Sequence, residues 1–134
     1  MNFKKENSKQ LIDVYIQKAR ERLVSAKALL DIGNFEDSIS RSYYAILDAA
    51  SACLTRKDVV PQSHAGAIKL FSLHYIKPGT VDRKYQRQFA KIEKARIEAD
   101  YTHLRIFTKI ETAEILADAD EFVNMAEALC RNGV

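Results

Sequence analysis

FEDSISRSYYAILDAASACLTR, residues 35–56, is apolar on two faces when it is wound as a helix. One face repeats larger side chains every three or four residues, namely Phe35, Ile39, Tyr43, Ile46, Ala50 and Cys53. The second face carries only small residues, Ser38, Ser42, Ala45, Ala49 and Ala52, which would let a neighbouring backbone approach closely. Gly33 and Asn34 come just before, as the C′ residue of one helix and the N-cap of the next. The pattern therefore predicts a helix over 35–56 that follows a tight turn.

Four further helices and no strand are expected in the rest of the chain. Three of them cover about 9–32, 65–76 and 108–131. The fourth helix of the chain begins near residue 82 and carries the stretch KARIEADYTHLR (94–105) at its C-terminal end. Ser63 is placed to cap the third helix, and Thr108 with Glu111 forms a capping box at the fifth. Long helices with short connections predict an all-α fold, an antiparallel up-and-down bundle of four long helices plus one shorter helix.

Composition fits a single soluble domain over residues 1–134, with a flexible N-terminus over 1–8. Of the 134 residues, 47% are hydrophobic and 29% are charged, and the net charge of +3 is too small to indicate nucleic-acid binding by itself. No apolar window of about 18 residues is present, so we expect no membrane span. Cys53 and Cys130 are expected as buried free thiols, which suits a cytoplasmic protein. We expect no metal site, because the three histidines are scattered.

The fourth helix separates into a basic face and an apolar face. Arg83, Arg87, Lys91 and Lys94 form a ridge that should face water, although it could also guide RNA. The apolar stripe on the other side consists of Tyr85, Phe89, Ile92, Arg96, Ala99 and His103, with Asp100 at its edge. Burying an unpaired guanidinium costs several kcal/mol. Arg96 therefore either pairs with Asp100 or Glu93 as a structural ion pair, or the stripe opens onto a cleft or subunit interface.

A second charged stripe lies on the helix over 35–56, away from its main apolar face, and consists of Arg41, Tyr44 and Asp48. It is interpreted either as an Arg41–Asp48 ion pair or partner contact, or as part of the same cleft as Arg96. His64, at the start of the third helix, is interpreted as a capping or packing residue in preference to a catalytic one.

Four segments together resemble a known family: SRSYYAILDAA (40–50), SHAGAIKLF (63–71), KARIEADY (94–101) and EFVNMAEAL (121–129). They resemble small stand-alone HEPN-domain proteins. That resemblance implies an all-helical, usually dimeric protein, often encoded beside a minimal nucleotidyltransferase. Many members are metal-independent ribonucleases and toxins of toxin–antitoxin pairs, and their motif is an Arg followed after four to six residues by a His. Arg96 and His103 match it at the longest spacing.

The resemblance predicts a cytoplasmic RNA-cleaving toxin that needs no cofactor and is paired with a minimal nucleotidyltransferase-type antitoxin. His103 would act as general acid or base, Arg96 would stabilise the phosphate, and Asp100 would orient one of them. A homodimer would supply two copies of each around one cleft. RNA or nucleotide would be bound by Tyr101, Arg41, Tyr44, Arg87, Lys91 and Lys94. The alternatives are a non-catalytic subunit that binds nucleotide or docks the nucleotidyltransferase, and a purely structural dimer.

Overall fold

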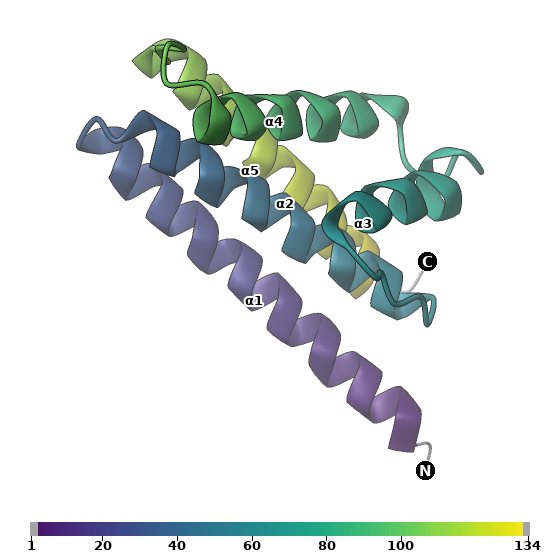
Figure 1. Ribbon diagram of the computed structural model, residues 1–134. Coiled ribbons are helices and arrows are strands. Elements are labelled where there is room, and N and C mark those ends of the chain that lie inside the picture. The colour runs from purple at the N-terminus through teal and green to yellow at the C-terminus, as the bar shows by residue number, and fades with distance from the viewer. Residues whose placement is uncertain (1–2, 133–134) are drawn as a thin grey trace.

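The computed structural model describes residues 3–132 and is all-helical over that range, as predicted. Its helices are α1 (Phe3–Asp31), α2 (Phe35–Arg56), α3 (His64–Phe71), the π-helical turn η1 (Ser72–Ile76), α4 (Arg83–Tyr101) and α5 (Lys109–Arg131). Consecutive long helices run in opposite directions, and α4 crosses above α2 (Figure 1). None of the helices within 3–132 is long and apolar enough to cross a membrane.

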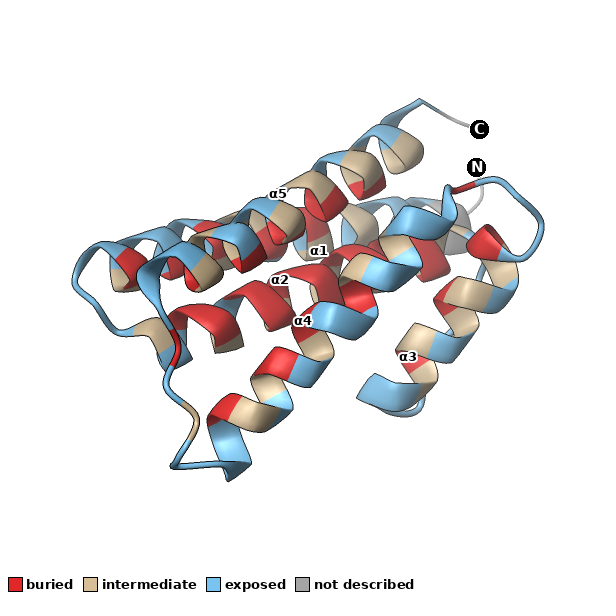
Figure 2. Cartoon of the chain, turned by 90° about the horizontal axis from the view of Figure 1, so that it is seen from above, coloured by how far each residue is buried: buried red, intermediate tan, exposed pale blue. Residues whose placement is uncertain are grey.

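Helix α2 is the central element, because it packs against α1, α3, α4 and α5. Both of its predicted apolar faces are buried, apart from the half-buried Phe35 at its start. On the small-residue face, Ser38 donates a hydrogen bond of 2.7 Å to the carbonyl of Ala26 in α1. Ala19 and Ala26 of α1 are fully buried, as expected where two backbones approach closely. Figure 2 shows the buried residues concentrated on α2 and on the helix faces that surround it.

An aromatic cluster fastens the second half of the chain to this core. The ring of Phe122 in α5 lies 5.3 Å from Phe71, 6.1 Å from Tyr85 and 5.4 Å from Phe89. Pairs at these separations add about 0.5–1.5 kcal/mol to the free energy gained by burial. The cluster therefore joins α5 to α3 and α4 and fixes the position of α4 over α2.

The predicted helix boundaries are confirmed at α2, at α5 and at the start of α4, and they are corrected at the start of α1, in the third helix and at the end of α4. Helix α1 begins at Phe3, not near Lys9, and takes in most of the segment expected to be flexible; residues 1 and 2 lie outside the described range. The third predicted helix becomes α3 followed by the π-helical turn. Gly33 adopts a φ of +84°, the left-handed conformation expected of a helix C′ residue. Asn34 is the N-cap of α2, but its side chain makes no capping hydrogen bond.

The caps of α3 and α5 form at the predicted residues. Ser63 Oγ accepts a hydrogen bond of 2.9 Å from the backbone N–H of Gly66. Thr108 Oγ1 accepts one of 3.1 Å from Glu111 N–H, so half of the predicted capping box is present. The other half is missing because the Glu111 carboxylate binds Arg105 instead.

The two cysteines are free thiols, as predicted, but they are neighbours in space. Cys53 Sγ and Cys130 Sγ lie 4.0 Å apart between α2 and α5. Cys53 is buried and Cys130 is half-buried, so the expectation of full burial holds for only one of them. The hydrogen bond from Cys130 and burial both raise the pKa of the Cys53 thiol.

Candidate functional site around Tyr44 and Arg96

Residues of four helices meet at Tyr44 on α2. We call this group the Tyr44 cluster: Arg22, Tyr43, Tyr44, Asp48, His64, Arg96 and Asp100. The half-buried Tyr44 ring has the guanidinium carbon of Arg22 at 5.5 Å from its centroid and that of Arg96 at 5.8 Å. The His64 ring meets it edge-on at 5.8 Å. Two cations and an imidazole thus share one aromatic ring, and they come from α1, α4 and α3, which all pack against α2.

Arg96 is held by three side chains. Its Nε lies 2.9 Å from Asp100 Oδ2, its Nη2 donates to the Tyr44 hydroxyl at 3.3 Å, and its guanidinium carbon lies 5.1 Å from the Tyr43 ring centroid. The predicted Arg96–Asp100 ion pair is confirmed. Burial opposes the charged form, but Asp100 and the two tyrosines outweigh it and raise the pKa of Arg96. About 23% of the Arg96 side chain stays exposed, so the cation is positioned and still reachable from solvent.

Asp48 belongs to the cluster through a partner that the sequence did not indicate. Arg22 of α1 donates from Nε to Asp48 Oδ2 at 2.6 Å. The predicted Arg41–Asp48 pair is wrong, because α1 packs beside this face of α2 and brings Arg22 closer. Arg41 is exposed, one turn before Tyr44 on the same face of α2. The stripe of Arg41, Tyr44 and Asp48 is also interpreted as part of the same cleft as Arg96. Of these three residues, Tyr44 makes the contact with Arg96.

His103 lies outside the Tyr44 cluster. Helix α4 ends at Tyr101, and the chain is extended at Thr102 with φ −124° and ψ 90°. The prediction that His103 continues the helical stripe was therefore wrong, because the helical periodicity stops two residues before it. Within residues 3–132, no hydrogen bond, ion pair or ring contact joins Arg96 to His103.

The His103 side chain is exposed and lines a cavity of about 360 Å³. The cavity lies between the turn that joins α1 to α2 and the loop that joins α4 to α5. Its other lining residues are Gly33, Asn34, Phe35, Glu36, Asp37, Arg105, Ile106 and Phe107. This cavity is thus beside His103, and no residue of the Tyr44 cluster lines it.

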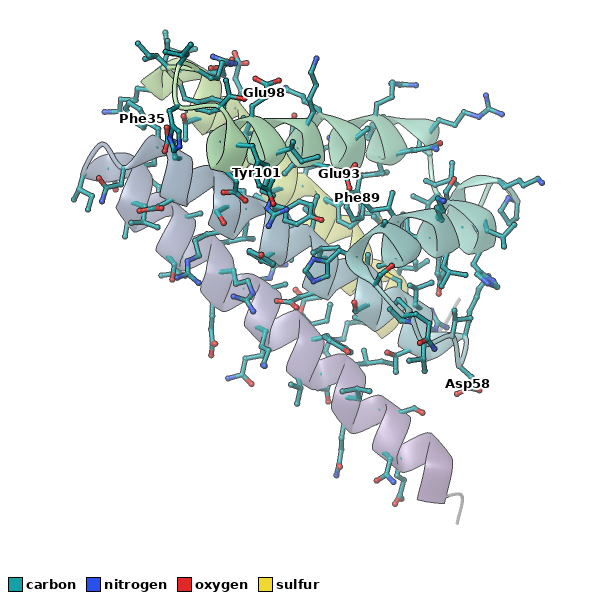
Figure 3. The ribbon with its side chains drawn as sticks, viewed as in Figure 1. Phe35, Asp58, Phe89, Glu93, Glu98 and Tyr101 are labelled. Atoms are coloured by element: carbon teal, nitrogen blue, oxygen red, sulfur yellow. The ribbon has the colours of Figure 1, made fainter. Side chains whose placement is uncertain are left out.

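Arg105 fixes the loop that carries His103. It donates to Glu98 of α4 at 2.8 Å, to Glu111 of α5 at 2.5 Å and to the carbonyl of Ile106 at 2.8 Å. Its guanidinium carbon also lies 4.3 Å from the Phe107 ring centroid. Figure 3 shows Glu98 on the side of α4 near the start of α5, and Glu93 on the side toward α3. Arg105 is a structural residue that the sequence analysis missed, although its acidic neighbours Glu98 and Glu111 were a signal for it.

The remaining predicted binding residues lie on the surface. Tyr101 is 74% exposed at the last position of α4. Arg83, Arg87, Lys91 and Lys94 are all exposed, which confirms the water-facing ridge, and Lys91 pairs with Asp118 at 3.1 Å. Among residues 3–132, no three side chains of His, Cys, Asp or Glu come together as a set of metal ligands.

The all-helical fold and the sequence of residues 12–129 match the HEPN domain family, and the chain belongs to that family. It is similar to a Methanocaldococcus jannaschii protein named "putative toxin", with 36% identity over 113 residues that cover 84% of each chain. It is also 32% identical to a UPF0332 protein of Gloeobacter violaceus over 83% of this chain and 89% of the relative. A UPF0332 protein of Pyrococcus horikoshii is 40% identical over 57% of this chain and 54% of the relative.

Proposed function

We propose that this HEPN protein is the metal-independent, RNA-cleaving toxin of a toxin–antitoxin pair. One observation carries the proposal: Asp100, Tyr43 and Tyr44 hold the Arg96 guanidinium in place while part of it stays exposed. A cation with a fixed orientation and spare donors is suited to bind the non-bridging oxygens of a phosphodiester. The name of the M. jannaschii relative supports the toxin assignment.

The proposed reaction is an internal transesterification. A base takes the proton of the ribose 2′-hydroxyl, the 2′-oxygen forms a bond to phosphorus, the bond from phosphorus to the 5′-oxygen breaks, and an acid protonates that leaving oxygen. Arg96 would stabilise the extra negative charge on the phosphorane, and Asp100 would keep the guanidinium oriented. His103 would carry one of the two protons. The products would be a 2′,3′-cyclic phosphate and a 5′-hydroxyl.

We further propose that Arg96 and His103 cooperate across a homodimer. The two side chains make no contact in one chain, whereas a second copy could bring its own His103 to Arg96. Exposed apolar side chains surround His103, with Tyr101 at 74%, Leu104 at 92% and Ile106 at 81% exposure, and a subunit contact would cover them. RNA would reach the cleft along the basic ridge of Arg87, Lys91 and Lys94, with Tyr101 and Arg41 as further contacts.

Cleavage of total RNA by the purified protein in the presence of EDTA tests the proposal. We expect cleavage with cyclic-phosphate ends by the wild type, and loss of at least about 100-fold in Arg96→Ala and His103→Ala. Lys18→Ala, at an exposed position of α1 outside both the Tyr44 cluster and the basic ridge, is the matched control and should cleave normally. Equal cleavage by the wild type and Arg96→Ala would remove the phosphate role of Arg96.

A second candidate is a non-catalytic subunit that docks a minimal nucleotidyltransferase. It is favoured by three exposed apolar residues of the α4–α5 region, Leu104, Ile106 and Ile110, of which Ile106 lines the cavity. Co-expression with such a protein separates the two functions. Two results together would favour docking: the chain alone does not arrest growth, and it forms a stable complex that is lost when Leu104 and Ile106 are replaced. Growth arrest that the partner relieves would favour a toxin with its antitoxin.

A further inference from the structure

His64 is the histidine that the fold brings to the two tyrosines that hold Arg96. Its ring centroid lies 5.8 Å from that of Tyr44 and 6.3 Å from that of Tyr43, edge-on to both. The Arg96 guanidinium contacts the same two rings. His64 comes from the start of α3 and Arg96 from the middle of α4, so this meeting depends on how both helices pack on α2.

The capping interpretation of His64 does not hold, because Ser63 caps α3. Ser63 Oγ accepts the hydrogen bond from Gly66 N–H, and the His64 ring takes no part in it. Simple packing does not describe the residue either, since His64 is exposed and no hydrogen bond within residues 3–132 involves its ring nitrogens. An imidazole that stands on a fixed aromatic pair with free nitrogens is positioned and available for proton transfer.

We propose that His64 is a second proton-transfer residue of the Arg96 site. The inference rests on the proposed RNA cleavage, which needs both a base for the 2′-hydroxyl and an acid for the 5′-oxygen. His103 supplies one of these groups, and His64 supplies the other. The phosphodiester would lie over Tyr44 with its non-bridging oxygens on Arg96, and His64 would face one end of the O2′–P–O5′ line.

The titratable and charged groups near His64 contact the same two tyrosines, and they come from three helices. Tyr43 and Tyr44 of α2 meet the imidazole directly. Arg22 of α1 and Arg96 of α4 contact the Tyr44 ring and pair with Asp48 and Asp100, and Glu93 of α4 acts on the pKa of Tyr43. The carboxylates Asp48 and Asp100 are each paired with an arginine, so neither competes for the imidazole as a free charge. Two histidines in opposite protonation states predict a bell-shaped dependence of the cleavage rate on pH.

The test is the pH profile of RNA cleavage by the wild type, His64→Gln and His64→Ala. His74→Gln, in the π-helical turn η1 and outside the Tyr44 cluster, is the matched control. Gln keeps the size and hydrogen bonding of the ring but does not titrate. We expect a loss of about 100-fold in His64→Gln and the disappearance of one limb of the profile. Loss of the acidic limb assigns the base to His64, and loss of the alkaline limb assigns the acid. Added imidazole should restore part of the rate in His64→Ala, and His74→Gln should match the wild type.

The outcomes separate the inference from the function on which it rests. If the wild type cleaves RNA and His64→Gln keeps the same rate and profile, His64 has no role and the proposed function still stands. If the wild type itself does not cleave RNA, both proposals fail. Thermal melts of each variant show whether a lost rate reflects a lost fold; because His64 is exposed, we expect all melts to coincide.

Discussion

Arg96 and Arg105 show what separates an available cation from a structural one. Both come from the stretch KARIEADYTHLR, and both lie against an aromatic ring, with exposed side-chain fractions of 23% and 34%. Arg105 donates hydrogen bonds to two carboxylates and a carbonyl, and these bonds hold the α4–α5 loop. Arg96 contacts one carboxylate and one hydroxyl, and no partner of its Nη1 occurs within residues 3–132. Exposure alone would rank Arg105 as the more accessible residue, whereas the count of free donors selects Arg96.

Replacing each arginine by lysine should give the largest difference between Arg96 and Arg105. Lysine keeps the charge but loses the planar fork, so Arg96→Lys should slow RNA cleavage by about 100-fold. Arg105→Lys should leave the rate within about threefold, because Arg105 directs three of its five N–H donors to Glu98, Glu111 and the Ile106 carbonyl and lies outside the Tyr44 cluster. Single-turnover cleavage of the same RNA measures both. Comparable losses in the two variants would contradict the distinction between them.

The aromatic support of Arg96 gives the next prediction. Tyr44 lies against both Arg22 and Arg96, so Tyr44→Leu should lower the free energy of unfolding by about 1–2 kcal/mol. Tyr44→Phe keeps the ring and loses only the 3.3 Å hydrogen bond from Arg96, for about 0.5–1 kcal/mol. Tyr101→Leu, at an exposed position, is the control and should stay within about 0.5 kcal/mol of the wild type. Urea unfolding followed by circular dichroism measures all three; a cost for Tyr44→Leu no larger than for Tyr101→Leu would show that the ring supports neither arginine.

The fold was largely predictable because its signals are local. Two apolar faces over 35–56, a glycine at the turn, and caps at Ser63 and Thr108 are each read from a few neighbouring residues. One error arises where a side chain from the preceding loop competes with a local signal. Glu111 could have completed its capping box, but Arg105 takes its carboxylate.

The candidate site was only partly predictable because it is built from four helices. The Arg96–Asp100 pair is an i,i+4 contact and could be counted along the helix. Arg22 and His64 reach Tyr44 from α1 and α3, and no periodicity within one helix relates them. His103 was misplaced for the opposite reason: the helical count was extended past the residue where the helix ends.

A smaller effect on the free energy of unfolding should come from breaking the ion pair between Arg22 and Asp48. Asp48→Asn leaves Arg22 without its carboxylate at a site where the two side chains are 31% and 17% exposed, and should cost about 1 kcal/mol. Asp31→Asn breaks the exposed pair with Lys27 and should cost no more than about 0.5 kcal/mol. Chemical unfolding at low and high salt compares the two variants. The loss of unfolding free energy in Asp31→Asn should vanish in 1 M salt, whereas most of the loss in Asp48→Asn should persist. Equal losses with equal salt dependence would mean that the Tyr44 cluster is not shielded from solvent.

The smallest effect concerns Arg105 and depends on pH. The hydrogen bond from Arg105 lowers the pKa of the Glu111 carboxyl below its usual 4.5. A carboxyl whose pKa is lower in the folded state adds stability above its unfolded pKa, and that stability is lost as the pH falls through the folded value. Arg105→Gln should therefore unfold at a lower urea concentration than the wild type at pH 6.5, with the gap narrowing steadily below pH 4.5. Lys94→Gln, on the exposed ridge, should show no such narrowing. A gap for Arg105→Gln that stays constant down to pH 3 would mean that Arg105 holds the loop through Phe107 and the Ile106 carbonyl, and not through its carboxylates.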